Sequence, residues 1–501
     1  MDNAPNFFEF QPGEGGFRST SQEQLEMLQK ALETSYDRYN QSGGQAMVPE
    51  SLERTLISTT FSEKHLCFWN DIPKKKAYST VEEYTTLDSY GGGSIGSGFF
   101  SGGGLPMETD LDAARRYALV KYLGTTRGIT HPMTQVNSLA GPGALAANNA
   151  EEKETLAGTR WLLRQLEWAL YWGNAATMPQ SINGIEASVF GTDMANVKSA
   201  MQGTNRNIID MRGANITDET LNEAAQVIVD NYGYPTKMYL SNYTLTDLSN
   251  YLAEQKRVLL NGLTNVNLGT PTTAFRSNFG DITYRNSLFL RNEERTAPGA
   301  GTHSKAPIAP VLNVAGITTP AAAAGDATKF GADDAGDYIY KITAFNPSGE
   351  SAPLVTDAVV VHAGDKVSIP VDHAGSPWSD PAHLDGVSGF RVYRSAKGGD
   401  ATTCRFLFEV AVNQAAGAIV NPTTIIDLNW LLPGTARSFV CDMSPDESIS
   451  TKVLTPLLKW PLAIIDTRIR WSLLLYLSDV ILYAPKKHVE IINIGRYQRG
   501  A

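Results

Sequence analysis

Helical periodicity disappears between residues 306 and 437 and returns afterwards, and this interruption limits the folds that the chain can adopt. The stretch just before it, 296–306, is rich in Gly, Ala, Pro and Thr, as linkers are. Inside the interruption, short apolar runs alternate with turn signals such as Asn346-Pro347-Ser348-Gly349, a spacing typical of a β-sandwich. Because mixed helix and strand patterns stand on both sides, we predict an α+β host fold with an all-β domain inserted at 306–437.

The chain of 501 residues exceeds what one hydrophobic core usually supports, so several packed units are expected. Six segments of the insert are predicted as strands: 311–314, 337–345, 366–371, 389–395, 404–412 and 424–428. An insert with its own core should be removable, so deletion of 306–437 with a short linker is expected to leave a foldable host.

Glycine dominates residues 91–104, and its backbone entropy is too high for the interior of a helix or strand. Strand-like patterns precede this stretch at 65–72 and 78–87, and an extended pattern follows at 111–123. We therefore predict a long two-stranded loop with a glycine-rich tip. The tip formally matches GxGxxG and GxSxG, but the helix that a dinucleotide site or a nucleophile elbow requires does not follow it.

The helix predicted over 148–173 has two apolar faces. Asn148 or Asn149 can cap it, and Gly173 supplies its end. One face carries Leu156, Leu163, Leu166 and Leu170, and the nearly opposite face carries Trp161, Trp168 and Trp172. A surface helix of a monomer needs only one apolar stripe. The tryptophan stripe is therefore covered either by more of the same chain or by a neighbouring subunit, and the pattern leaves both open.

Residues 183–296 alternate helices and strands. Thr217 is predicted to cap a helix that Gly233 ends, and a strand is predicted at 237–241. A second helix at 245–260 and a second strand at 282–290 repeat the order, which indicates a compact α/β unit.

The mixed pattern resumes after residue 437 and continues to the C-terminus. Its most apolar run, 471–484, is interrupted by Asp479 and is shorter than the roughly 20 residues that span a bilayer. We predict that this run is buried protein core.

The composition argues against several classes of function. The formal net charge is -10 at pH 7, so the chain lacks the basic field of a tight nucleic-acid binder. Its 3 cysteines lie far apart and its 7 histidines show no ligand spacing, which indicates neither a disulfide scaffold nor a metal site. The N-terminus lacks the basic start and apolar core of a signal peptide. No catalytic, cofactor-binding or metal-binding residue is predicted, and no cofactor.

The order of these parts resembles the major capsid proteins of tailed bacteriophages, which have the Hong Kong 97-type fold. Segments 216–221 and 231–241 look like the helix and strand of the axial domain in that family. Segments 338–346 and 389–395 are similar to fibronectin type III and immunoglobulin-like modules.

The resemblance implies six regions in chain order: an N-terminal arm (1–60), an extended β loop with a glycine-rich tip (61–135), a peripheral domain with a spine helix (136–182), an axial α/β domain (183–296), an inserted immunoglobulin-like or fibronectin-like sandwich (306–437) and a return to the capsid core (438–501). It also implies a non-enzymatic subunit that self-assembles as hexamers and pentamers into an icosahedral shell around double-stranded DNA. The insert is then expected to project from the outer surface.

The expected partners are other copies of the chain, a scaffold, a portal and decoration proteins, with weak non-specific contact to packaged DNA and no membrane. Assembly is expected in the bacterial host cytoplasm, and the final location is the virion capsid. The residues expected at subunit interfaces are Trp161, Trp168, Trp172, Gly91, Gly92, Gly93, Phe99, Phe100, Phe7 and Phe8.

Two other functions stay open at this point. One is a surface adhesin or tail protein that binds host glycans through the β domain, although adhesins usually string such modules in tandem. The other is a carbohydrate-active hydrolase with a binding insert, which requires paired carboxylates about 5–10 Å apart.

Overall fold

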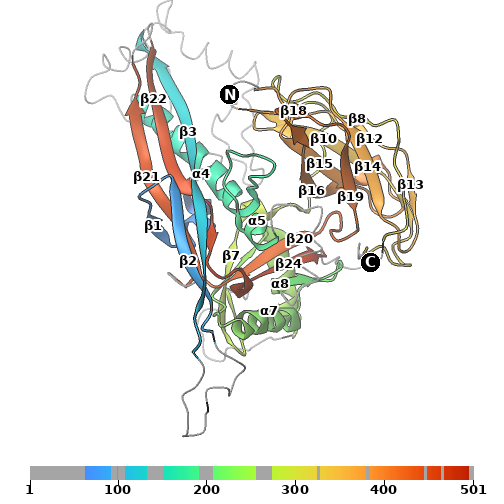
Figure 1. The fold of residues 1–501 in the computed structure, drawn as a ribbon, viewed down its shortest axis with the longest axis horizontal. Helices are drawn as coiled ribbons and strands as arrows, with labels where there is room; N and C mark the ends of the chain where they lie inside the picture. Colours follow the sequence, from blue (N-terminus) through green and yellow to red (C-terminus); the bar gives the residue numbers. More distant parts are fainter. Residues whose placement is uncertain are drawn as a thin grey trace, which may run out of the picture. The chain divides into compact units, whose positions relative to one another are not determined.

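The computed structural model describes residues 63–91, 99, 108–132, 150–190, 207–255, 273–323, 328–379, 384–444, 448–463 and 468–495. It is a mixed α/β structure, as predicted, with a long sheet backed by one long helix, a second sheet flanked by helices, and a β-rich segment that lies in sequence between β7 and β20 (Figure 1). Within the described ranges no helix is long and apolar enough to cross a membrane.

The first sheet, which we call the long sheet, has the strand order β1-β21-β22-β3-β2. The bounds of its strands are β1 (Lys74–Lys76), β2 (Val81–Ser89), β3 (Asp112–Thr130), β21 (Ile449–Pro461) and β22 (Arg468–Ser478). A short strand, β23 (Ile481–Leu482), also pairs with β21. β3 and β22 pair without interruption from Val120–Ser478 to Thr130–Arg468, although more than 300 residues separate them in sequence. The long loop and the C-terminal part of the chain therefore form one sheet.

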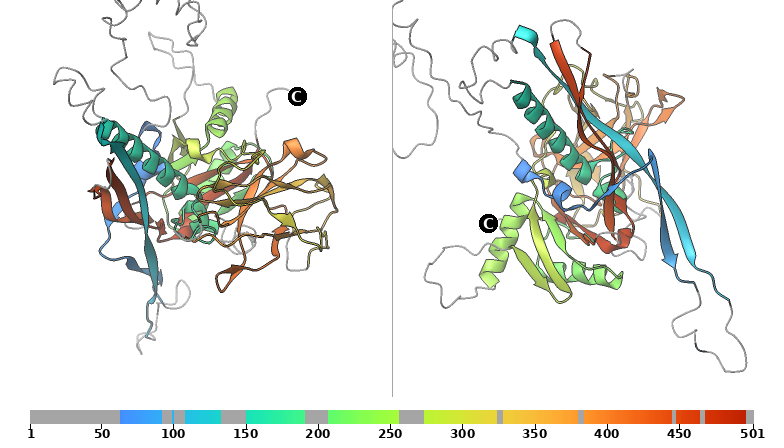
Figure 2. Two further views of the ribbon diagram at one scale, coloured as in Figure 1. Left: turned by 90° about the horizontal axis from the view of Figure 1, so that it is seen from above. Right: turned by 90° about the vertical axis from the view of Figure 1, so that its left-hand side faces the viewer.

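Helix α4 (Ala150–Trp172) packs on one face of the long sheet, as Figures 1 and 2 show. The helix lies close to the sheet at Gly158, where a Cβ atom would stand 2.7 Å from Leu473 Cδ1 and 3.2 Å from Arg127 Cγ. Leu162 of α4 is buried with Ile129 and Trp471 of the sheet. A residue larger than glycine at 158 would require the side chains of Leu473 and Arg127 to shift.

The second sheet, which we call the axial sheet, has the order β4-β24-β20-β5-β7-β6. The bounds of its strands are β4 (Ile208–Asp210), β5 (Lys237–Leu240), β6 (Ala274–Ser277), β7 (Gly280–Asn286), β20 (Ala436–Cys441) and β24 (His488–Ile494). The central strands β20 and β24 follow the β-rich segment in sequence, whereas their neighbours β4 and β5 precede it. This sheet can therefore close only after the β-rich segment has been synthesised.

Three helices accompany the axial sheet: α5 (Ile185–Phe190), α7 (Asp218–Asp230) and α8 (Asn242–Gln255). The predicted cap of α7 is confirmed, because the Thr217 hydroxyl accepts a hydrogen bond from Thr220 N at 3.4 Å. The apolar side of α7, including Leu221 and Ile228, packs with Met238 of β5 and Val440 of β20. The observed position and cap of α7 therefore agree with the prediction from the sequence.

The β-rich segment contains strands of two main sheets and one core. A sheet of order β11-β10-β15-β16, with β12 also paired to β10, faces a sheet of order β19-β14-β8, and β9 pairs with β13. The strand bounds are β8 (Val311–Leu312), β9 (Gly336–Tyr338), β10 (Tyr340–Asn346), β11 (Gly349–Glu350), β12 (Leu354–Val355), β13 (Val359–Val361), β14 (Val367–Asp372), β15 (Gly389–Arg394), β16 (Arg405–Ala411) and β19 (Thr423–Asp427), with a small hairpin β17 (Gln414–Ala415) and β18 (Ala418–Ile419). Both main sheets contribute to the same buried core, for example through Ile342 and Ile369. A buried ion pair joins Arg394 Nη1 to Asp427 Oδ2 at 2.6 Å across this core.

Two local predictions are wrong. Segment 65–72 is not a strand but forms two helical turns, η1 (Glu63–His65) and α2 (Phe68–Asp71). The reason is a long-range contact, because the buried carboxylate of Glu167 accepts backbone N–H bonds at the start of α2. Segment 282–290 leaves the strand at Asn286 and turns into the 3₁₀-helix η4 (Leu288–Leu290), where the Ser287 hydroxyl accepts a bond from Phe289 N.

Candidate assembly surface

The tryptophan face of α4 is largely covered by its own chain. Trp172 is 8% exposed, its Nε1 donates to Phe289 O at 2.6 Å, and its ring lies 6.2 Å from the Phe439 ring. Trp168 is partly buried against the same core. Only Trp161, 42% exposed, remains open among the three.

The expectation that a neighbouring subunit covers Trp172 is therefore wrong. The helical wheel shows which residues share a face, but it does not show that η4 and β20 wrap around the C-terminal end of α4. On the opposite face, Leu166 and Leu170 are buried as predicted, whereas Leu156 is 42% exposed.

The predicted loop residues are described only in part. Gly91 has φ +73°, and a Cβ atom there would stand 1.9 Å from Asp110 O, so only glycine fits where the two strands approach. Phe99 is 92% exposed. Gly92, Gly93 and Phe100 of the tip lie outside the described residues, and so do Phe7 and Phe8 of the arm.

The long sheet has one covered and one open face. Along β22, Trp471, Leu473, Leu475 and Leu477 are buried, whereas Ser472, Leu474 and Tyr476 between them are half-buried. Paired residues of antiparallel strands lie on the same face. The face opposite α4 therefore also carries Tyr122 and Thr126 of β3, and Thr126 Oγ1 lies 3.0 Å from Ser472 Oγ.

Strand β21 extends this open face. Trp460 pairs with Ser472 and Leu458 with Leu474, so both side chains lie opposite α4. Trp460 is 55% exposed, Leu458 40% and Tyr122 61%, and Tyr122 packs edge-on against Tyr476 at 4.8 Å between ring centroids. We call Tyr122, Leu458, Trp460, Leu474 and Tyr476 the open sheet face. Contiguous exposed apolar side chains of this kind mark a surface that binds another protein.

Arginines stand at one end of the open sheet face. Arg470 and Arg468 continue its side of β22 beyond Ser472. Together with Thr126 and Thr130 they line a groove of about 470 Å³, whose lining also includes Arg127 from the α4 side of the sheet. An apolar centre with a charged rim is the usual composition of a protein–protein interface.

The sequence alone did not single out this surface. The run 471–484 was predicted as core because nearly every residue in it is apolar, and a two-residue alternation is hard to see in such a run. Register shifts at Val453/Thr455 and Thr455/Leu458 further hide which residues of β21 share a face. A visible signal is the placement of Ser472 among the apolar residues of β22.

No group of three or more His, Cys, Asp and Glu side chains in the described ranges is arranged to hold a metal ion. The cavity at Trp168 and Trp172 is only about 30 Å³, which is too small for a substrate.

No family model matches the chain. Among curated proteins, it is similar to the major capsid protein of Staphylococcus phage K, with 26% identity over 455 residues that cover 90% of each chain. It is also similar to the putative major capsid protein of Enterococcus phage phiEF24C, with 24% identity over 461 residues and 91% of each chain. Among solved structures, the capsid of Myoviridae phage XM1 aligns with a TM-score of 0.41 at 10% identity, covering 88% of this chain and 96% of that one.

The similarity to curated relatives runs along nearly the whole length of both proteins, so it includes the host fold and most of the β-rich segment. It supports the prediction of a phage major capsid protein over the adhesin and hydrolase alternatives, and a structural role over an enzymatic one.

Proposed function

We propose that the chain is the major capsid protein of a tailed bacteriophage and that copies of it build the virion shell. The observation that carries this proposal is the similarity to phage major capsid proteins over 90% of both chains. The architecture fits it: a long loop that shares a sheet with the C-terminal part, a spine helix on that sheet, and a separate axial sheet. We assign this arrangement to the Hong Kong 97-type fold, with the arm, loop, peripheral, axial, inserted and C-terminal regions at the boundaries predicted from sequence.

The open sheet face is the proposed contact between copies. Stable interfaces bury roughly 800 Å² on each partner, with large aromatic side chains supplying most of the binding energy. Trp460 and Tyr122 are large, aromatic and more than half exposed, so association would remove much apolar surface from water. Trp161 and Phe99 are further exposed aromatics that a neighbour could cover.

The β-rich segment is the proposed immunoglobulin-like or fibronectin-like sandwich. β10 pairs with β15 although β14, which lies between them in sequence, belongs to the other sheet, as Greek-key sandwiches require. In the assembled shell this sandwich faces outward. A scaffold, a portal, decoration proteins and packaged DNA, contacted weakly because the net charge is -10, complete the partners of a subunit that assembles in the host cytoplasm.

Electron microscopy of the purified chain tests this function. We expect the expressed protein to form closed shells made of hexamers and pentamers, alone or with its scaffold, and to sediment as particles rather than as subunits. A chain that stays monomeric at micromolar concentration with its scaffold present, or that forms only fibres, would contradict the proposal.

A further inference from the structure

We infer that the β-rich segment is an intramolecular clamp that contacts both the α4 side of the host fold and the strands β20 and β24 of the axial sheet, and that it stabilises the subunit itself. This inference does not depend on the proposed function, because it concerns how one copy of the chain is held together. It departs from the expectation that the insert can be removed without harm to the host.

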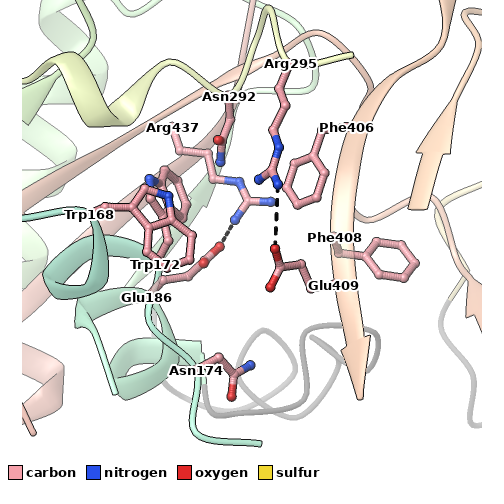
Figure 3. A pocket seen from close by; sticks show the side chains of 10 residues that line it. All are labelled: Trp168, Trp172, Asn174, Glu186, Asn292, Arg295, Phe406, Phe408, Glu409 and Arg437. Atoms are coloured by element: carbon pink, nitrogen blue, oxygen red, sulfur yellow. Dashed lines mark ion pairs between the residues drawn. The ribbon is translucent and has the colours of Figure 1, made fainter. Parts of the chain in front are cut away.

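The first place of attachment surrounds the small cavity at the end of α4 (Figure 3). Host residues on one side are Trp168 and Trp172 of α4 and Glu186 of α5, and the segment supplies Phe406, Phe408 and Glu409 of β16. The space is about 30 Å³, enough for a water molecule or two and no more. Side chains of both parts line this space, so the two parts meet here.

Two arginines contribute to this contact, and Figure 3 shows their guanidinium groups close together between the α4 side and β16. Arg437 of β20 pairs with Glu186, and its Nη2 donates to Leu407 O of β16 at 3.1 Å. Its guanidinium also lies 5.5 Å from the ring centroid of Trp172. Arg437 is 6% exposed, and the host carboxylates of Glu186 and Glu490 together with the segment carbonyl of Leu407 offset the cost of burying its charge.

The second arginine is Arg295, which follows η4 in the host and contacts the segment. Its guanidinium stacks 4.4 Å from the ring centroid of Phe406, and its Nη2 lies 3.9 Å from Glu409 Oε1. The same Glu409 oxygen accepts a bond from Arg391 Nε of β15 at 2.8 Å, and Arg391 also pairs with Glu350 at 2.8 Å. A charged network inside the segment thus continues into the host.

The second group of contacts lies on β24, the strand that pairs with β20, around Asn493. Asn493 Nδ2 donates to Trp430 O at 2.7 Å, and its Oδ1 accepts from Leu432 N at 2.8 Å. Arg212, beside β4, donates to Asn429 O at 2.8 Å. Ile492 of β24 is fully buried inside the core of the segment, and Ile208 of β4 packs against that core.

The two groups of contacts lie on the paired strands β20 and β24, and together they join the segment to the host over one extended interface. Separation of the segment from the host would expose Ile492 and Trp172 to water and would leave Asn493 and Arg437 without the backbone partners that the segment supplies. The segment and the host should therefore unfold in one cooperative step rather than as two domains.

The clamp is tested by urea unfolding of the full-length chain, in which hydrogen exchange of individual peptides reports the unfolding of each element. The variant is Phe408→Ala on β16, with Glu409→Gln as a milder change should the first fail to fold, both compared with wild type in the same oligomeric state. We expect the midpoint, the urea concentration at which half of the molecules are unfolded, to fall by about 1 M, both for the host elements α7 and β5 and for strand β14 of the segment. α7 and β5 do not touch Phe408, so a shift there reports coupling between the two parts. Val314→Ala, at a fully exposed position of the segment, should leave both midpoints unchanged.

A lower midpoint for β14 with an unchanged midpoint for α7 and β5 would show an independent appendage and overturn the inference. Unchanged midpoints for all three would overturn it as well, because the contact at Phe408 would then stabilise nothing.

Discussion

Replacement of Trp460 and Tyr122 together by serine is expected to abolish shell formation while the subunit stays folded. Both side chains belong to the open sheet face and are more than half exposed, so neither contributes much to the core of its own chain. Buried aromatic anchors of an interface contribute about 2–4 kcal/mol each. Because every copy in a shell carries the change at each of its contacts, we expect the particle yield to fall by at least about tenfold, measured by sedimentation and electron microscopy.

The matched control is Val314→Ser with Val360→Ser, which also removes two exposed apolar side chains but from the β-rich segment. These residues are 102% and 54% exposed, and we expect normal particles from this variant. Circular dichroism and thermal unfolding of both double variants should match wild type. If the Trp460 and Tyr122 variant forms particles at wild-type yield, the open sheet face is not required for assembly.

Replacement of Glu167 by alanine is expected to cause the largest loss of stability of any single substitution in the spine helix. The Glu167 side chain is fully buried and accepts three backbone N–H bonds, from Cys67 at 2.9 Å, Phe68 at 2.7 Å and Trp69 at 2.9 Å. Burial raises the pKa of this carboxyl, and the three N–H bonds oppose that shift. Alanine would leave three buried donors without acceptors and a cavity beside Phe68, at a cost of about 3–5 kcal/mol in the free energy of unfolding.

Two controls separate the hydrogen bonds from other effects of this substitution, both measured by chemical denaturation. Glu167→Gln keeps one acceptor oxygen and most of the volume, so we expect it to lose less than half as much stability as the alanine variant. Glu223→Ala removes an exposed glutamate from α7 and is expected to change the free energy of unfolding by no more than about 0.5 kcal/mol. An alanine variant at 167 as stable as the Glu223 variant would contradict the capping role of Glu167.

Elements whose structure depends on residues nearby in the sequence were predictable. The Thr217 cap and the apolar spacing of α7 depend on neighbours within one helix, and the strand at 237–241 follows directly from it. All six strands predicted in the β-rich segment correspond to observed strands, because turns and β-branched runs mark short strands clearly. The phage capsid interpretation rested on the order of such elements, and the curated relatives support it.

Features that depend on distant contacts were not predictable in this way. The α2 turn forms because Glu167, about 100 residues away, accepts the N–H bonds at its start. The local pattern of 65–72 therefore predicts a strand where the structure has a helical turn. Trp172 is covered by Phe289 and Phe439, which no helical wheel includes. The open sheet face combines β3, β21 and β22 from both ends of the chain, so its side-chain set exists only once the register is known.

Hydroxyl-radical footprinting of Trp460 in free subunits and in assembled particles is the most direct test of the central claim. The assembly mechanism predicts that Trp460 is oxidised readily in the free subunit, where it is 55% exposed, and is protected several-fold in the particle. Equal oxidation of Trp460 in both states would show that the open sheet face stays in contact with solvent after assembly and would contradict the account.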